Sequence, residues 1–255
     1  MIQSFQKDKL CVHICSTRRS MGLLAAGDVA KTIRALLSEQ AELNMIFAAA
    51  PSQNEFLEAL YPEKDIDWSR INAFHMDEYV GLKADAPQRF GNYLKEKIFD
   101  RAPFRSVNYL DGNCPDLEKE CERYTALLQQ YPADIVCMGI GENGHVAFND
   151  PHTARFNDSN WVKAVDLDRV CRMQQVNDGC FAAIDLVPAY ALTLSVAALM
   201  RGKYLFCMVP SRTKAWAVYH TLNDPVSEDI PATCLRMHEN AVLYTDADSA
   251  SMIKQ

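Results

Sequence analysis

The chain has 255 residues, of which 49% are hydrophobic and 23% are charged, and its formal net charge is -7. This composition supplies enough apolar side chains for a globular core. The negative charge argues against a nucleic-acid surface, and no apolar run approaches the roughly 20 residues that span a bilayer. We therefore predict no nucleic-acid partner and no membrane partner.

Nine cysteines are present, an odd number with no C-x-x-C pair, and Cys137 and Cys207 lie inside apolar runs. Buried thiols in a reducing compartment explain this placement better than disulfides or a zinc site. The first nine residues are polar and contain no apolar signal core. We expect a cytoplasmic protein without a metal site.

Short apolar runs alternate with helical patterns along the chain. We expect strands at 10–15, 45–50, 71–76, 107–110, 134–140, 204–209 and 241–244, and helices at 20–40, 52–60, 87–99, 115–130, 187–200 and 211–222. This alternation predicts an α/β fold: a three-layer, doubly wound, mostly parallel sheet of Rossmann-like type, forming a single domain over 1–255. Because ligands on such sheets bind beyond the carboxyl ends of the strands, the residues that follow each strand are the candidates.

The first such segment reads Ala48-Ala49-Ala50-Pro51-Ser52-Gln53-Asn54-Glu55. The spacing of Ser52 and Glu55 predicts a capping box, with Ser52 at the start of a helix that begins at residue 52. Free backbone N–H groups at such a start can bind an anion, which makes Ala50 and Ser52 candidate ligand contacts. Plain capping explains Ser52 as well, and Glu55 would repel an anion.

The second segment places two adjacent carboxylates, Asp77 and Glu78, directly after an apolar strand. A carboxylate at this position can act as a general base if its pKa suits the reaction. The alternative is a turn-forming role, because acidic residues often follow strands.

The third segment reads Gly139-Ile140-Gly141-Glu142-Asn143-Gly144-His145 and ends at Pro151. Its G-x-G-x-x-G pattern does not indicate dinucleotide binding, because it lies mid-chain, Pro151 prevents a long following helix, and no acidic strand end lies about 20 residues on. Gly141 and Gly144 instead let the backbone turn close beside a ligand. His145, with Glu142 or Asp150 nearby in the chain, forms a general acid/base unit, and a capping or core histidine is the alternative.

The fourth segment, Val209-Pro210-Ser211-Arg212-Thr213-Lys214, places two cations at the start of a predicted helix. This arrangement opposes the preference of the helix dipole for negative charge at that end. An anionic ligand held by Lys214 or Arg212 would resolve the conflict. A solvated basic turn is the alternative.

Taken together, these segments resemble the glucosamine-6-phosphate deaminase/isomerase family. Residues 72–82 resemble its Met-Asp-Glu-Tyr-Val-Gly-Leu block, and residues 139–151 resemble its Gly-x-Gly-x-(Asp/Asn)-Gly-His-x-(Ala/Gly)-Phe-Asn-Glu-Pro block. Residues 187–193, 211–214 and 234–238 match later family segments in order, so the likeness covers roughly residues 10–248.

The resemblance implies that an amino-sugar 6-phosphate, as glucosamine 6-phosphate or galactosamine 6-phosphate, isomerises from aldose to ketose and loses ammonia, with no cofactor and no metal. Asp77 would move a proton between C2 and C1. His145 would assist ring opening with the support of Asp150, and Asn143 stands where the family has aspartate or asparagine. A small-molecule sugar phosphate is the implied partner, and formation of a homo-oligomer is left open.

Three departures mark a divergent member. The family's Thr-Gly-Gly-Thr-Pro phosphate loop is replaced here by Ala49-Ala50-Pro51-Ser52-Gln53. The family's glutamate near the histidine is Asp150 in this chain. The position of a basic phosphate-binding residue of the family falls near Gln174. Arg172 is the expected substitute for that ligand, and Lys214 is retained.

Two other functions compete with deamination. A 6-phosphogluconolactonase-type hydrolase shares the expected fold and a Gly-His turn, but the ending Phe148-Asn149-Asp150-Pro151 favours a deaminase. A non-catalytic sugar-phosphate sensor is the second alternative, and the presence of both Asp77 and His145 argues for an enzyme.

Overall fold

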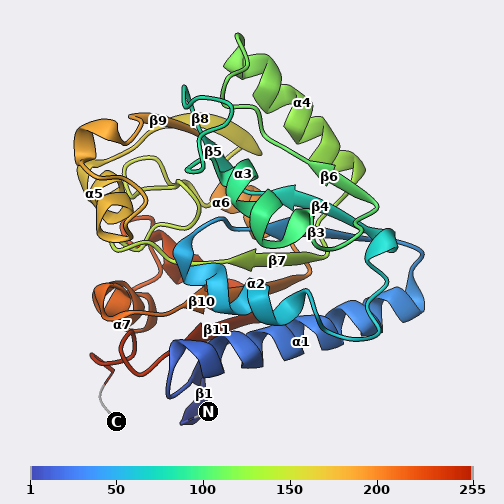
Figure 1. Ribbon diagram of the computed structural model, residues 1–255. Coiled ribbons are helices and arrows are strands. Elements are labelled where there is room, and N and C mark those ends of the chain that lie inside the picture. Colours follow the sequence, from blue (N-terminus) through green and yellow to red (C-terminus); the bar gives the residue numbers. More distant parts are fainter. Residues whose placement is uncertain (1, 254–255) are drawn as a thin grey trace.

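The computed structural model describes residues 2–253 and contains a large mixed sheet between two layers of helices (Figure 1). Residues 1, 254 and 255 of the expected domain lie outside this description. Within the described chain the sheet has eight strands in the order β1-β2-β11-β10-β7-β3-β4-β6. Their bounds are Gln3–Lys7 (β1), Leu10–Ile14 (β2), Leu43–Phe47 (β3), Ile71–His75 (β4), Ser106–Asn108 (β6), Ile135–Met138 (β7), Tyr204–Val209 (β10) and Ala241–Thr245 (β11).

All neighbours in this sheet pair in parallel except β1 and β2, which form an antiparallel hairpin at one edge. The central strands are apolar on both faces, as the three-layer arrangement requires. The predicted α/β class with a mostly parallel sheet is therefore confirmed.

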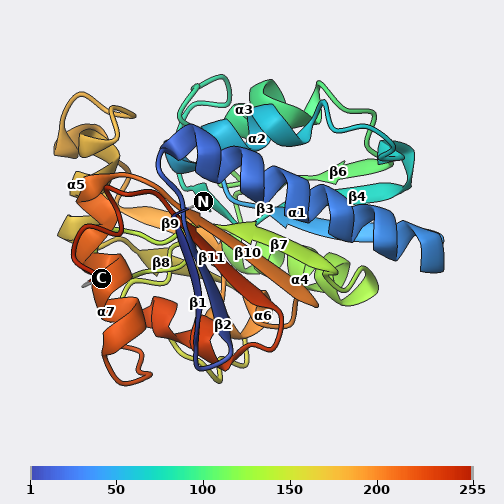
Figure 2. The same cartoon turned by 90° about the horizontal axis from the view of Figure 1, so that it is seen from below.

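Helices cover both faces of the sheet, as the view in Figure 2 shows. Helices α1, α2 and α3 lie on one face, and α4, α6 and α7 lie on the other. Their bounds are Arg18–Glu39 (α1), Asn54–Leu60 (α2), Phe90–Leu94 (α3), Leu117–Gln130 (α4), Val196–Leu199 (α6) and Ala215–Asn223 (α7), with a π-helical turn at Lys95–Phe99 and 3-10 turns at Pro51–Gln53, Trp68–Arg70, Ile184–Leu186, Arg212–Lys214 and Pro231–Met237. Two apolar clusters, one on each face, form the core.

A second sheet of three strands lies beyond the carboxyl ends of the large one. Its order is β5-β9-β8, all antiparallel, with bounds Asp77–Tyr79 (β5), Val162–Asp166 (β8) and Tyr190–Leu194 (β9). Helix α5, Arg169–Asn177, lies between β8 and β9 along the chain. The chain leaves the large sheet after β4 and enters the small one at Asp77, so this residue stands where the two sheets meet.

The helix predicted at 187–200 is wrong. The chain there forms β9, and only Val196–Leu199 is helical. The segment Tyr190-Ala191-Leu192-Thr193-Leu194 is held as a strand by pairing with β5 on one side and β8 on the other. Because β5 and β8 are distant from this segment in the sequence, the spacing of its apolar residues does not show that it pairs as a strand. Strands β1, β5 and β8 and helix α5 are also absent from the predicted elements.

Two helix starts also differ from expectation. Helix α1 begins at Arg18, before the predicted start at residue 20, and Thr17 caps it: the Thr17 side chain accepts a hydrogen bond from the Ser20 backbone N–H. The predicted capping box at Ser52 and Glu55 is wrong, because Pro51–Gln53 is a 3-10 turn and α2 begins at Asn54 without a side-chain cap. Within residues 2–253, no helix combines the length and apolarity that crossing a bilayer would require.

Helices α1 and α2 touch at Gly22, where the absence of a side chain is required. A Cβ atom on Gly22 would lie 2.6 Å from the backbone carbonyl carbon of Glu55 and 2.7 Å from its Cβ. We expect Gly22→Ala to lower the free energy of unfolding by about 1–3 kcal/mol, because the two backbones must separate.

Gly27 lies on the same helix and serves as the matched control, because a Cβ atom added there would meet nothing within 4 Å. Gly27→Ala should raise the free energy of unfolding by about 0.5–1 kcal/mol through helix propensity alone. Urea unfolding of both variants measures the difference, and equal effects of the two substitutions would contradict the proposed contact.

Candidate active site

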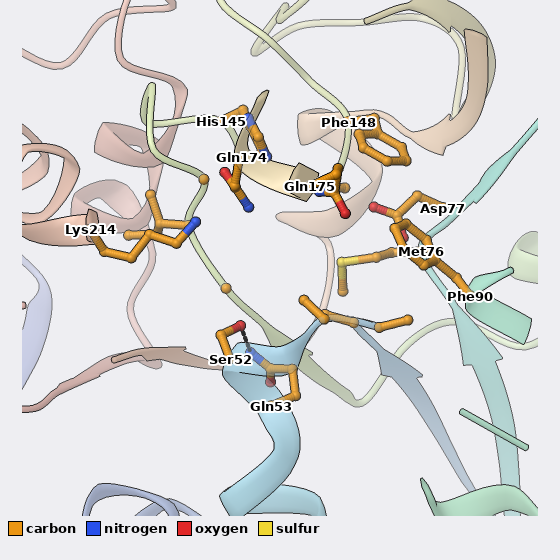
Figure 3. Close-up of a pocket in the computed structure, with 17 residues that line it drawn as sticks. Ser52, Gln53, Met76, Asp77, Phe90, His145, Phe148, Gln174, Gln175 and Lys214 are labelled. Atoms are coloured by element: carbon orange, nitrogen blue, oxygen red, sulfur yellow. Dashed lines mark hydrogen bonds between the residues drawn. The ribbon is translucent and has the colours of Figure 1, made fainter. Parts of the chain in front are cut away.

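A polar pocket lies where β3, β4, β7 and β10 end (Figure 3). Three residues from separate segments line it: Asp77 at the start of β5, His145 in the loop after β7 and Lys214 in the 3-10 turn after β10. The remaining lining residues are Ala48, Ala49, Ala50, Ser52, Gln53, Met76, Phe90, Gly139, Ile140, Gly141, Ala147, Phe148, Gln174 and Gln175. The free space among these side chains is about 50 Å³. Small-molecule sites usually hold about 300–1,000 Å³, so the pocket is narrow in this structure.

Asp77 is buried at the base of one side of the pocket, with 6% of its surface exposed. Its Oδ1 atom has no hydrogen-bond partner among the described residues. Burial, and then the negative charge of Glu78, raise the pKa of Asp77 well above the ordinary value of 3.8. A carboxylate in this state is a stronger base than an exposed one and is free to accept a proton from a ligand.

Glu78, the neighbouring carboxylate, serves the fold instead. Its oxygens accept hydrogen bonds from the backbone N–H groups of Tyr79, Phe90 and Gly91 at 2.9–3.0 Å. Burial raises the pKa of Glu78, and these bonds and Arg89 oppose that rise. Glu78 thus ties the start of α3 to β5 and leaves Asp77 as the carboxylate that faces the pocket.

His75 fixes the backbone beneath Asp77. Its Nδ1 atom lies 2.8 Å from the carbonyl oxygen of Asp77, and its Nε2 atom accepts from the Leu110 N–H at 3.0 Å. Nδ1 therefore carries the hydrogen and donates it. Complete burial lowers the pKa of His75 to about 4, so this ring is neutral near pH 7 and acts as a positioning residue.

His145 is held by Asn143 and Asp150. Its Nδ1 atom lies 2.7 Å from the Asn143 side-chain oxygen and 3.1 Å from the Asp150 Oδ1 atom. Both neighbours are acceptors, so Nδ1 carries the hydrogen and Nε2 remains available to a ligand. Asn143 also donates to Asp150 at 2.9 Å and to Asp168 at 3.0 Å, which sets the orientation of its amide.

Asp150 is fully buried and keeps its charge. Burial would raise the pKa of Asp150, but the hydrogen bond and charge of His145, the Asn143 amide and the Asp168 backbone N–H hold it below 3.8. A carboxylate fixed in this way stabilises a protonated imidazole on His145. The histidine of the glycine-rich segment is thus an oriented acid/base group with a buried carboxylate behind it.

Gly141 is needed for the His145 ring to reach this position. A Cβ atom on Gly141 would lie 2.1 Å from the Cε1 atom of His145. Gly144, also expected to contact the ligand, does not line the pocket: it has φ +84° and faces Ile230, so it shapes the turn only. Glu142 points away as well, toward the Asn177 amide.

Lys214 supplies the positive charge of the pocket. The residue is 3% exposed, and its Nζ atom has no hydrogen-bond partner within residues 2–253. Burial lowers the pKa of Lys214 below 10.5, although Asp178, Glu142 and Cys171 oppose this shift. Arg212, the other candidate cation, is exposed and does not line the pocket. A buried ammonium without a partner is a site for an anion.

The segment after β3 lies opposite Lys214 and carries Ser52 and Gln53 (Figure 3). Gln53 donates to Ser52 Oγ at 3.1 Å, and its amide nitrogen lies 3.4 Å and 3.3 Å from the carbonyl oxygens of Met138 and Met208. It thereby links the ends of β7 and β10 beneath the pocket. Glu55 is held outside by Arg18, at 2.9 Å and 3.0 Å, so it does not repel an anion at Ser52.

Helix α5 brings Gln174 and Gln175 over the pocket. Gln174 accepts from the Glu142 backbone N–H at 2.8 Å. Arg172, expected to bind the ligand, does not reach the pocket: its guanidinium donates to the carbonyl oxygens of Ile184 and Val187 at 2.8 Å and 2.9 Å. On a helix, a residue two positions from Gln174 points to a different side, so Arg172 cannot replace it.

The sequence around the pocket residues that were not predicted gives little indication that they line a ligand site. Gln53 adjoins Ser52 in a segment already singled out, but nothing local shows that its amide turns inward. Gln175 lies in an element absent from the predicted ones, and Met76, Phe90 and Phe148 resemble ordinary core residues.

Among residues 2–253, two groups of side chains have ligand atoms close enough together to hold a metal ion: His145, Asp150 and Cys171, and Asp150, His152 and Asp168. In both groups Asp150 is already occupied by hydrogen bonds from Asn143 and the Asp168 N–H. Burial raises the pKa of Cys171 well above 9.0, which disfavours the thiolate that binds metals.

A buried carboxylate, an oriented imidazole and a buried ammonium in one pocket define an enzyme site for an anionic small molecule. Residues 16–244 match the family described as glucosamine-6-phosphate isomerases/6-phosphogluconolactonase. The chain belongs to this family.

Curated relatives are similar over most of the chain. It is 33% identical to the glucosamine-6-phosphate deaminase of Streptococcus gordonii over 221 residues, which cover 87% of this chain and 91% of the relative. It is 32% identical to the glucosamine-6-phosphate deaminase of Lactobacillus delbrueckii subsp. bulgaricus over 76% of this chain and 82% of the relative.

Solved structures agree with this placement. A monomeric glucosamine-6-phosphate deaminase superposes with a TM-score of 0.85 at 29% identity, over 94% of this chain and 99% of that one. The 6-phosphogluconolactonase of Thermotoga maritima superposes with a TM-score of 0.76 at 23% identity, over 93% and 99%. The second likeness concerns the fold alone.

Because Lys214 is buried without a partner, we expect Lys214→Met to stabilise the empty protein by about 1–3 kcal/mol. The same substitution should weaken the binding of inorganic phosphate and phosphorylated sugars at least tenfold, since the charge that attracts them is gone. Thermal unfolding and titration calorimetry measure the two effects.

Lys31→Met, on the exposed surface of α1, is the matched control and should change neither quantity. Binding in the unaltered protein should also weaken as pH rises through the lowered pKa of Lys214, at a pH below 10.5. Unchanged phosphate affinity in Lys214→Met would remove this residue from the site.

Proposed function

We propose that this enzyme isomerises an amino-sugar 6-phosphate and releases its nitrogen as ammonia, forming a ketose 6-phosphate. The observation that carries the proposal is the shared pocket: a buried carboxylate with a free oxygen, an oriented imidazole and an unpaired ammonium line one small space. These are a base, an acid/base group and an anion ligand.

The pocket has two chemically different sides (Figure 3). Lys214, Gln174 and His145 lie on one side, and Asp77, Met76 and Phe90 lie on the other. A phosphate bound at Lys214, beside the Ser52 hydroxyl, directs the far end of the sugar toward Asp77. The reacting carbons C1 and C2 then lie beside the carboxylate.

Ring opening uses His145. Its free Nε2 atom accepts the proton of the O1 hydroxyl and returns a proton to the ring oxygen, which leaves an aldehyde at C1. Asp150 stabilises the imidazolium between these two transfers. A positioned acid/base group of this kind contributes about 10²–10⁴-fold to the rate.

Isomerisation and loss of nitrogen follow at the Asp77 side. Asp77 takes the proton from C2 and delivers it to C1, while a proton passes from the nitrogen to O1. C1 becomes a hydroxymethyl group and C2 becomes an imine. Water adds to the imine carbon and ammonia leaves, so the product carries a ketone at C2.

The buried position of Asp77 favours this reaction over lactone hydrolysis. A lactonase activates water against an ester and needs no base that moves a proton between adjacent carbons. A raised pKa makes Asp77 suited to that carbon-to-carbon transfer, because a more basic carboxylate removes a proton from carbon more readily. The relatives at 32–33% identity are named as deaminases, which also supports the proposal.

Asp77→Asn keeps the shape of the side chain and removes the base, so kcat should fall by at least 10³-fold while ligand affinity changes little. Ammonia release and ketose formation from glucosamine 6-phosphate and galactosamine 6-phosphate are the measurements. Asp85→Asn, on the exposed surface, is the control. Turnover of 6-phosphogluconolactone with no ammonia from either amino sugar would overturn the proposal.

The pH dependence provides a separate check. Asp77 acts as a base only when it is deprotonated, so kcat/KM should fall as pH decreases through its raised pKa. The acid limb of the profile therefore lies above the ordinary aspartate value of 3.8. A profile that stays flat down to about pH 4 would exclude Asp77 as the base.

A further inference from the structure

A second cavity adjoins the Asp77 side of the pocket, and we call it the annex. It is lined by Ala49, Ala50, Pro51, Pro87, Gln88, Phe90, Tyr93, Gln175 and Cys180. Four of these residues, Ala49, Ala50, Phe90 and Gln175, also line the catalytic pocket, so the two spaces share walls. The annex holds about 260 Å³ of free space.

The lining of the annex selects for a neutral, largely apolar group. None of its nine lining residues carries a charge, and prolines, alanines and two aromatic rings predominate. The Tyr93 hydroxyl is already bonded to the Ala50 carbonyl oxygen at 2.8 Å and to the Asn54 side chain at 2.7 Å. A charged group placed there would meet the uncharged amides of Gln88 and Gln175 but no opposite charge that offsets the loss of its hydration.

The position of the annex identifies which part of a substrate reaches it. Phe90 and Gln175 lie close to Asp77 at the side of the pocket opposite Lys214 (Figure 3). In the proposed reaction this side holds C1 and C2 of the sugar, and the nitrogen is attached to C2. A substituent on that nitrogen would extend past Phe90 and Gln175 into the annex.

We propose that the preferred substrate is an N-substituted amino-sugar 6-phosphate whose nitrogen carries a small, neutral alkyl group that lies in the annex. This inference rests on the proposed function. The steps are the same as in the proposed function: C2 forms an imine whose nitrogen bears the substituent, water adds to C2, and the bond between C2 and the nitrogen breaks. The products are a ketose 6-phosphate and a primary amine in place of ammonia.

Binding to the unaltered protein tests the annex without requiring turnover. N-propylglucosamine 6-phosphate should bind about tenfold more tightly than glucosamine 6-phosphate, because each buried methylene group strengthens binding about fourfold and burial is incomplete. N-carboxymethylglucosamine 6-phosphate, with a charged substituent, should bind more weakly than the unsubstituted sugar. Equal or weaker binding of the N-propyl sugar overturns the proposal and shows that the annex takes the sugar itself or nothing.

A variant that fills the annex provides the second test. Cys180 lines the annex and not the catalytic pocket. Cys180→Phe should abolish the roughly tenfold advantage of the N-propyl sugar and leave the affinity for glucosamine 6-phosphate within about twofold. Cys180→Ala keeps the space and should retain the advantage. An advantage that persists in folded Cys180→Phe overturns the assignment, and the ligand series on the unaltered protein decides the question if that variant does not fold.

Measuring the formation of ketose 6-phosphate from the N-propyl sugar and from glucosamine 6-phosphate distinguishes a failure of this inference from a failure of the proposed function. Higher kcat/KM for the N-propyl sugar, with release of propylamine, supports both. Turnover of glucosamine 6-phosphate alone overturns the inference and keeps the function. Tighter binding of the N-propyl sugar with no turnover of either sugar keeps the annex as a binding subsite and overturns the deamination.

Discussion

The constraint around which this molecule is organised is a pair of opposite charges in one pocket, Asp77 and Lys214, whose buried Oδ1 and Nζ atoms have no hydrogen-bond partner in the part of the chain that the structure describes. Burial raises the pKa of Asp77 and lowers the pKa of Lys214, so each group is held in an environment that disfavours its charge. Such groups lower stability, and the surrounding core must offset the cost. A ligand that brings a phosphate to one side and a proton donor to the other satisfies both.

The rest of the fold keeps these groups in place. His75 and Glu78 hold the backbone on either side of Asp77, and Asn143 and Asp150 hold His145. Gln53 ties together the strand ends beneath the pocket. Each of these polar side chains is bonded to the backbone or to another side chain, which fixes the geometry of the groups that face the ligand. The divergent loop at 49–53 therefore has a structural function in addition to lining the site.

Several features follow from local sequence. The alternation of apolar strands and helices predicts the α/β class, and the rule that ligands bind beyond the strand ends leads to Asp77, His145 and Lys214, which line one pocket. Local sequence fails where long-range pairing decides the structure. The apolar spacing of β9 indicates a helix because its partners, β5 and β8, are remote in the chain. Arg172 is wrongly predicted as a ligand residue because the chain alone does not show which side of α5 faces the pocket.

The sequence by itself therefore determined the class of fold, the family and the segments that form the site, since these depend on patterns along the chain that can be read without knowing which segments meet. Only the tertiary structure decided which member of each polar pair faces the pocket: Asp77 and not Glu78, and Lys214 and not Arg212. It also decided that Asp150, and not Glu142, lies behind His145 and contacts its Nδ1 atom. It also revealed the annex, whose walls come from separate segments of the chain. The physical reason is that burial and contact are properties of segments brought together by folding, and adjacent residues of like charge differ only in which way the folded backbone turns them.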